Sequence, residues 1–136
     1  MKWKNVEREF EEIKILFGMK NADVRLVIPK DFKVISGFAL GSYWGRVDKT
    51  KKIITVKRNR PIQQIRNTIA HELAHLLFPN KPHWWIETFS YKIISIKDDY
   101  GRIGRYAKRY GHSPRELPSK KRLIEMAKEA AERLNL

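Results

Sequence analysis

Residues 61–78 read PIQQIRNTIAHELAHLLF, and their apolar positions recur every three or four residues. This periodicity is typical of an amphipathic helix, and Pro61 suits the first turn of one. Pro79 and Pro82 then interrupt the pattern, and an apolar-rich run from Trp84 to Ile96 predicts a second helix. We therefore expect two consecutive helices separated by a short proline-containing turn.

The residues before this pair predict one helix and a small sheet. Residues 2–17 have apolar positions at helical spacing, and Gly18 is the expected stop. Three short runs rich in β-branched and aromatic residues follow: 24–29, 38–47 and 53–56. The connection at 48–51 suggests a hairpin between the last two runs. The predicted fold class is α+β, with a small, partly antiparallel sheet of about three strands packed on the N-terminal helix and on the helix of residues 61–78, followed by further helices.

The chain has the length of one domain. Its 136 residues can bury one core, so we predict a single domain over residues 1–136. Glycines and prolines make residues 101–118 look mostly irregular, and Ser119 is the expected cap of a last helix. Residues 101–136 are therefore expected to form a basic C-terminal extension that ends in a helix.

Composition excludes several kinds of chemistry and of location. The chain has no cysteine, which excludes disulfides and thiolate sites, so any metal must be bound by His, Asp or Glu. No apolar run reaches the roughly 18 residues needed to cross a bilayer, and Met1 to Phe10 lack the features of a signal peptide. We expect a soluble cytoplasmic protein, and its composition also fits a thermophile.

The segment His71-Glu72-Leu73-Ala74-His75 carries the predicted chemistry. Its two histidines are four residues apart, so on a helix they project from one face and can reach the same ion. Zn²⁺ binds neutral imidazole nitrogens, and this pair supplies two of them. Glu72 is adjacent, where it can take a proton from a metal-bound water without binding the metal. The motif predicts zinc-dependent peptide-bond hydrolysis with Glu72 as the general base.

This part of the chain resembles a known family. Phe38 to Tyr43, Ile53 to Val56 and Asn67 to His75 look like the core of zincin metallopeptidases, and the chain is most similar to the gluzincins and the minimal minigluzincins. The resemblance implies a peptide or protein substrate, cleaved by an endopeptidase rather than an exopeptidase, in an active or a latent form. It also implies that the substrate adds as a strand to a sheet edge. Gly41 to Gly45 could form that edge, although the same glycines fit a bulged hairpin strand equally well.

The third zinc ligand has two candidates. A catalytic zinc usually has three protein ligands, and the Gly and His that follow the motif in metzincins are absent here. His83 and Glu87 are four residues apart, so on one helix both can approach the ion. We favour Glu87, because a glutamate among apolar residues requires a reason and because gluzincins use a glutamate from the next helix, although the spacing here is short for that group. His83 is the alternative, as in SprT-like peptidases.

Two further positions have competing interpretations. Tyr91 lies one turn beyond Glu87 and is a candidate catalytic residue that donates a hydrogen bond to that ligand or to the oxyanion, or it is simply packed. His112 is either a surface histidine or part of a segment that returns over the cleft, where His112 or Glu116 would stabilise the transition state or block the metal.

Positive charge is concentrated in the last third of the chain. The sequence has 29 Lys and Arg against 15 Asp and Glu, a net charge of +14, which favours nonspecific binding to nucleic acid. The basic residues near Tyr106 and Tyr110 are Arg102, Arg105, Lys108, Arg109 and Lys120 to Arg122. These residues also fit an ordinary solvated basic surface, which is the interpretation we favour. If they do bind nucleic acid, two alternative functions follow: a SprT-like peptidase acting on nucleic-acid-associated proteins, or a non-catalytic nucleic-acid-binding or regulatory protein that keeps zinc for folding.

Overall fold

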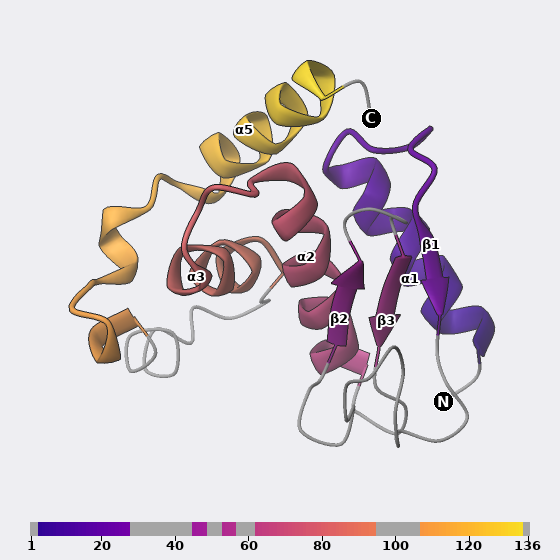
Figure 1. Ribbon diagram of the computed structural model, residues 1–136, viewed down its shortest axis with the longest axis horizontal. Coiled ribbons are helices and arrows are strands. Elements are labelled where there is room, and N and C mark those ends of the chain that lie inside the picture. Colours follow the sequence, from indigo (N-terminus) through magenta and orange to yellow (C-terminus); the bar gives the residue numbers. More distant parts are fainter. Residues whose placement is uncertain (1–2, 28–44, 49–52, 57–61, 95–106, 135–136) are drawn as a thin grey trace.

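The computed structural model describes residues 3–27, 45–48, 53–56, 62–94 and 107–134 (Figure 1). In chain order its elements are α1 (Trp3–Leu16), β1 (Arg25–Val27), β2 (Gly45–Asp48), β3 (Ile53–Val56), α2 (Ile62–Leu77), α3 (His83–Ile94), the 3-10 turn η2 (Pro114–Glu116) and α5 (Lys120–Arg133). The four helices follow the predicted ranges closely, and the Ser119 side chain accepts a hydrogen bond from the Arg122 backbone N–H at the start of α5. These helix predictions are confirmed.

Gly18 has two roles: it ends α1, and it lets α5 pack closely against this turn. Its φ of +73° lies in the left-handed region that a side chain disfavours. A Cβ at this position would also lie 3.1 Å from Lys128 Cγ and 3.2 Å from Lys128 Cα, so the absence of a side chain lets α5 approach closely. The sequence signal that stops α1 therefore also allows the last helix to pack.

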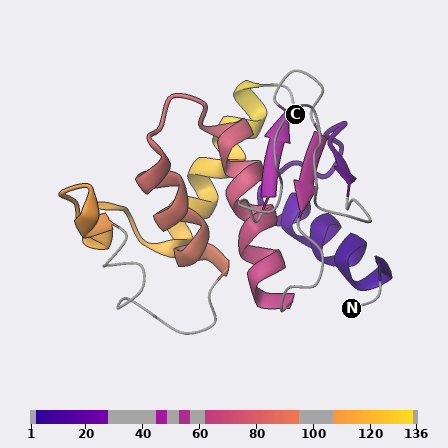
Figure 2. The same cartoon turned by 60° about the horizontal axis from the view of Figure 1, so that its bottom comes forward.

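Helix α2 lies at the centre of the domain, with contacts to α1, α3, α5, β2 and β3. Its Ile69 and Leu73 are fully buried. Figures 1 and 2 both show the strands on one side of α2 and α3 on the other. The helix that carries the candidate motif is thus held from several sides, which is what a rigid site needs.

Aromatic residues hold α3 against the end of α2. Trp85 packs against Phe78 with ring centroids 5.1 Å apart and against Phe89 at 5.4 Å. Phe89 in turn contacts Phe17 beyond the end of α1, at 5.6 Å. Leu123 and Ala127 of α5 complete this core from the C-terminal side. Trp85 is therefore a packing residue, as expected of a tryptophan in an apolar helix.

The three strands are short and mixed in direction. β3 is central, with β1 parallel to it and β2 antiparallel to it. Within the described residues, β2 pairs with β3 alone and so forms one edge. Of the predicted strand at 38–47, residues 45–47 lie in β2 and residues 38–44 are outside the described part.

The fold-class prediction needs correction. Helices account for 73% of the residues whose side chains the structure describes. The described core side chains come from the helices and from the loops that join them. Strands of three or four residues can contribute few side chains, whereas helices of 12 to 16 residues contribute many. An α+β domain built on a three-stranded sheet is therefore replaced by a predominantly helical one.

Among the helices that the structure describes, none combines the length and the apolar composition that a bilayer crossing requires.

Candidate metal centre

Helix α2 brings His71 and His75 together. Their Nε2 atoms are 3.0 Å apart, and their ring centroids are 4.7 Å apart. His71 is buried, with 8% of its surface exposed, and His75 is half-buried. The i, i+4 spacing on one helix face accounts for this approach. The geometry that the sequence motif implied for the two histidines is present.

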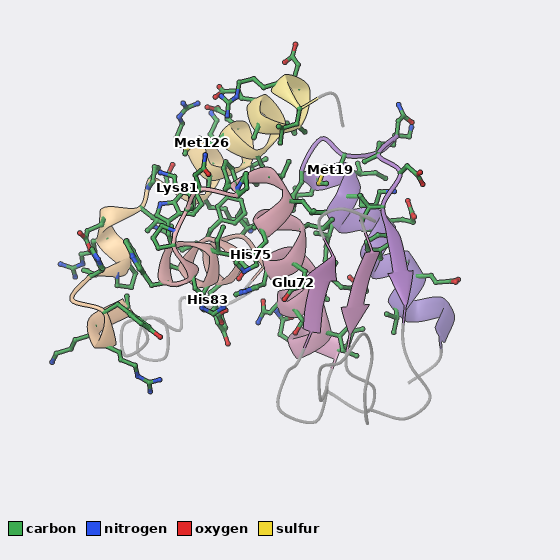
Figure 3. The ribbon with its side chains drawn as sticks, in the orientation of Figure 1. Met19, Glu72, His75, Lys81, His83 and Met126 are labelled. Atoms are coloured by element: carbon green, nitrogen blue, oxygen red, sulfur yellow. The ribbon has the colours of Figure 1, made fainter. Side chains whose placement is uncertain are left out.

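His83 joins the pair from the first residue of α3. Its ring centroid lies 4.7 Å from that of His71 and 5.6 Å from that of His75. One ligand nitrogen from each of the three rings lies within 4.8 Å of the other two. Figure 3 shows Glu72, His75 and His83 gathered where α2 meets the start of α3. We call His71, His75 and His83 the histidine triad.

The donor set and the spacing both fit a metal ion. Two nitrogens bound to one zinc at about 2.1 Å lie roughly 3.4 Å apart in a tetrahedral site. The shortest distance in the triad, 3.0 Å, is already close to this value, and the others lie within 4.8 Å. Small rotations of the imidazole rings would bring all three nitrogens to one ion. The histidine triad could therefore hold a metal.

The protonation of His83 favours metal binding. His83 is exposed as a residue, but its ring faces two other imidazoles. Desolvation of the ring and the charge of His71 lower the pKa of His83 below its ordinary value, while the Glu87 carboxylate acts in the opposite direction. A lowered pKa keeps the ring neutral near pH 7, and only a neutral ring can bind a metal.

Glu87 lies behind His71 rather than within the triad. Its Oε2 atom is 2.5 Å from His71 Nδ1, on the side of the ring opposite the nitrogen that faces His75. Metal-binding histidines usually donate their second N–H to such a carboxylate, which fixes the tautomer and orientation of the ring. Of the two candidate third ligands, the structure brings His83 into the group and places Glu87 next to it.

The two candidate catalytic residues lie on the two helices of the site. Glu72 is buried, with 7% of its surface exposed, and it follows His71 directly on α2. Tyr91 is half-buried on α3, one turn beyond Glu87. Both side chains already interact with neighbouring groups. Glu72 is therefore a buried residue directly next to one member of the triad in the chain.

Polar contacts fix α2 against its neighbours at its N-terminal end. Arg66 Nε lies 2.8 Å from Glu9 Oε2 on α1. Gln63 accepts a hydrogen bond from Arg66 and donates one of 3.2 Å to the carbonyl oxygen of Ile94 at the end of α3. These contacts link α2 to α1 and to α3 at the end of α2 that precedes the histidines.

His112 belongs to a contact that sequence analysis missed. Its ring stacks on Trp84 with centroids 3.8 Å apart and an interplanar angle of 8°. Its Nδ1 lies 3.2 Å from Glu116 Oε2, and hydrogen bonds from the Ser113 backbone and from His112 lower the pKa of Glu116. His112 and Glu116 thus pair with each other beside Trp84, and neither joins the triad. The i, i+4 spacing of His112 and Glu116 was the available signal for the pairing.

The basic residues of the described C-terminal part are exposed. They are Lys108, Arg109, Arg115, Lys120, Lys121, Arg122, Lys128 and Arg133. Arg122 forms ion pairs with Glu125 at 3.3 Å and Glu129 at 3.0 Å on its own helix, so part of its charge is neutralised. Arg102, Arg105 and Tyr106, which the sequence placed in the same cluster, lie outside the described residues.

Zinc affinity is expected to fall on acidification as the pH drops through the pKa of His83, which in the folded protein lies below the ordinary histidine value of about 6.5. The lowered pKa of His83 means that the folded protein binds this proton less readily than the unfolded chain does. The neutral ring is therefore kept above pH 6.5 and is lost only as the pH falls through the lower, folded value. Competition titrations against a chelator of known affinity at pH 5 to 8 would measure this dependence. An affinity that stays constant down to pH 5 would contradict a site made of imidazoles.

Comparisons of the chain with protein-family models, with curated proteins and with solved structures find no match.

Proposed function

We propose that the protein is a zinc-dependent peptidase of the zincin type. The observation that carries the proposal is the histidine triad, in which three imidazoles from α2 and α3 converge beside the buried Glu72. Three protein ligands with one open position are typical of catalytic zinc sites, whereas structural sites usually have four. A carboxylate next to the ligands and not among them supplies the base that hydrolysis needs.

We assign the third ligand to His83 and a supporting role to Glu87. The ring centroid of His83 lies 4.7 Å from that of His71 and 5.6 Å from that of His75. The Glu87 carboxylate binds the Nδ1 atom of His71 and so directs the Nε2 atom toward the ion. In this assignment His83 binds the metal, and Glu87 orients the His71 ring.

Each residue of the site then has a defined part in hydrolysis. A bound zinc would supply Lewis acidity, which polarises a carbonyl and lowers the pKa of a coordinated water. Glu72 accepts the proton of the attacking water and passes it to the leaving amine. The Tyr91 hydroxyl lies on α3, one turn past Glu87, where it can donate a hydrogen bond to Glu87 or to the developing oxyanion.

An extended peptide is the substrate that best fits the surroundings of the site. β2 is an edge strand within the described residues, and α2 contacts it. Strand addition to an exposed edge binds the main chain of a peptide irrespective of its sequence. Gly45, the first residue of β2, lies within the predicted docking edge; residues 41–44 are outside the described part. Binding along an edge favours cleavage within a chain, as in an endopeptidase.

A second candidate differs only in its substrate. The exposed cationic side chains between Lys108 and Arg122 favour a peptidase that acts on proteins near nucleic acid. The use of His83 as the third ligand is compatible with a SprT-like enzyme as well. The metal chemistry is the same for both candidates.

Metal removal tests the proposal. The zinc-loaded protein is expected to cleave denatured casein, because an unfolded substrate offers extended segments. Removal of the metal with a chelator should abolish cleavage, and one equivalent of zinc should restore it. Fragments would be followed by mass spectrometry, with circular dichroism as a check that the metal-free protein stays folded. The absence of casein cleavage by the zinc-loaded protein would refute the proposed activity.

A further inference from the structure

Residues 107–117 form a compact segment that is fixed to α3 by two contacts. In the middle of the segment, the His112 ring stacks on Trp84 with centroids 3.8 Å apart and an interplanar angle of 8°. At its end, the Lys92 side chain donates a hydrogen bond of 3.3 Å to the carbonyl oxygen of Leu117. Figures 1 and 2 both show the segment, in orange, at the edge of the domain beside α3. We call residues 107–117 the C-terminal segment.

The first turn of the C-terminal segment presents its side chains to solvent. Ala107 is fully buried and anchors the turn. The three residues after it are exposed: Lys108, Arg109 and Tyr110, the last with 52% of its surface accessible. Gly111 follows with a φ of +77°, and an added Cβ there would meet no atom within 4 Å. A ligand that approaches this turn therefore meets an open surface.

His112 offers a partly exposed aromatic ring in a fixed position. Its side chain is 36% accessible, and its Nδ1 atom lies 3.2 Å from Glu116 Oε2. The Glu116 carboxylate is itself held, because it accepts a hydrogen bond of 2.6 Å from the Ser113 backbone N–H. One face of the ring is covered by Trp84, so the accessible part is the opposite face and the edge. A flat ring held in this way gives another flat group a preorganised surface for stacking.

The charge of the C-terminal segment is mainly positive. Its cations are Lys108, Arg109 and Arg115, and all three are exposed. Glu116 is its one acidic residue, and the Glu116 carboxylate is already bound by His112 and by the Ser113 backbone. Positive charge alone also fits a solvated surface. The additional observation is that two accessible aromatic rings, of Tyr110 and His112, lie among these cations.

We propose that the C-terminal segment binds single-stranded nucleic acid, either DNA or RNA. Bases stack on the two rings, and phosphates contact the three cations, which is how proteins bind single strands without reading their sequence. A duplex fits less well, because its bases are already stacked on one another. An aromatic side chain of a peptide could also stack here, but it has no phosphate for the cations. The inference goes beyond the proposed peptidase function and does not depend on hydrolysis.

Loss of stacking is the first test, measured by fluorescence anisotropy with a labelled single strand of about 12 nucleotides. We expect His112→Ala and Tyr110→Ala each to weaken binding about tenfold, whereas His112→Phe keeps a ring and should stay within about threefold. Ile15→Ala removes an exposed apolar side chain of α1 and should leave the affinity unchanged. DNA and RNA strands of one sequence would be compared: binding of either supports the inference, and the tighter one identifies the ligand. Binding of neither, or unchanged affinity in both alanine variants, would overturn it.

Salt dependence is the second test, and it separates local phosphate contacts from the net charge of the protein. Three contacts predict a slope of roughly −2 for log affinity against log salt, or about a twentyfold loss between about 50 and 200 mM. Arg115→Ala should make the slope less steep by about 0.7, whereas His112→Ala should leave it unchanged. Lys20→Ala, at an exposed cation after α1, is the matched control and should leave the slope unchanged. If Lys20→Ala and Arg115→Ala change the slope equally, binding is a general effect of charge and the inference is wrong.

Two controls separate this surface from the fold and from the proposed peptidase site. The midpoint of thermal unfolding should be the same in Tyr110→Ala as in the original protein, because Tyr110 is exposed. If affinity falls only together with this midpoint, the residue is structural and the inference is wrong. If His112→Ala changes the cleavage of casein peptides but not the binding of oligonucleotides, the ring serves the peptide substrate and the inference is also wrong. Failure to cleave casein would refute the peptidase and leave the nucleic-acid result intact.

Discussion

His83→Ala is expected to lose stoichiometric zinc, whereas Glu87→Ala should keep one zinc per chain with an affinity about 10 to 100 times lower. The His83 ring belongs to the triad, so its removal leaves two ligands, too few to hold a catalytic zinc. Glu87 contacts His71 through the nitrogen that faces away from His75, so its removal loosens one ligand without deleting it. Elemental analysis after dialysis would give the stoichiometry, and chelator competition the affinity.

His112→Ala provides the matched histidine control for this experiment. His112 stacks on Trp84, the residue next to His83, yet it is outside the triad. This variant should therefore keep one zinc per chain with unchanged affinity. If Glu87→Ala loses the metal and His83→Ala keeps it, Glu87 is the third ligand, as the sequence favoured, and the proposed ligand set is wrong.

The sequence could locate two of the three triad residues because their relation is local. His71 and His75 lie on one helix, and their spacing alone determines that they share a face. The choice between His83 and Glu87 as the third ligand depends instead on non-local contacts. Both are on one face of α3, so the choice depends on how far α3 is shifted along α2. That shift is set by tertiary packing, including the contacts of Trp85 and Phe89 with Phe78 at the end of α2, which no local pattern reports.

The same distinction explains what could be predicted of the fold. Each helix has its own periodicity and its own stop signals, such as Gly18 and Pro79, and the predicted helices agree with the observed ones. Strand pairing is non-local: β1 pairs in parallel with β3, across a long stretch of chain, and no turn motif indicates such a pairing. The contact between Trp84 and His112 joins residues 28 positions apart and was missed for the same reason.

Glu72→Gln is expected to lower kcat for casein peptides by at least a hundredfold while the protein keeps its zinc. A general base contributes roughly 10²- to 10⁴-fold to such reactions, and glutamine has nearly the shape of glutamate without its proton affinity. Because Glu72 is buried, we do not expect an exposed carboxylate elsewhere on the protein to act as the general base when Glu72 is replaced. Single-turnover rates and zinc content would be measured on the same preparation.

Glu132→Gln, the same change at an exposed position of α5, is the control and should leave both values unchanged. The combination of full zinc content with lost turnover in Glu72→Gln has a specific meaning. A protein that keeps zinc only to stabilise its fold would show no turnover in either form, and a hydrolase with another base would keep its turnover in Glu72→Gln. Only an enzyme that uses Glu72 for proton transfer loses activity while its metal centre stays intact.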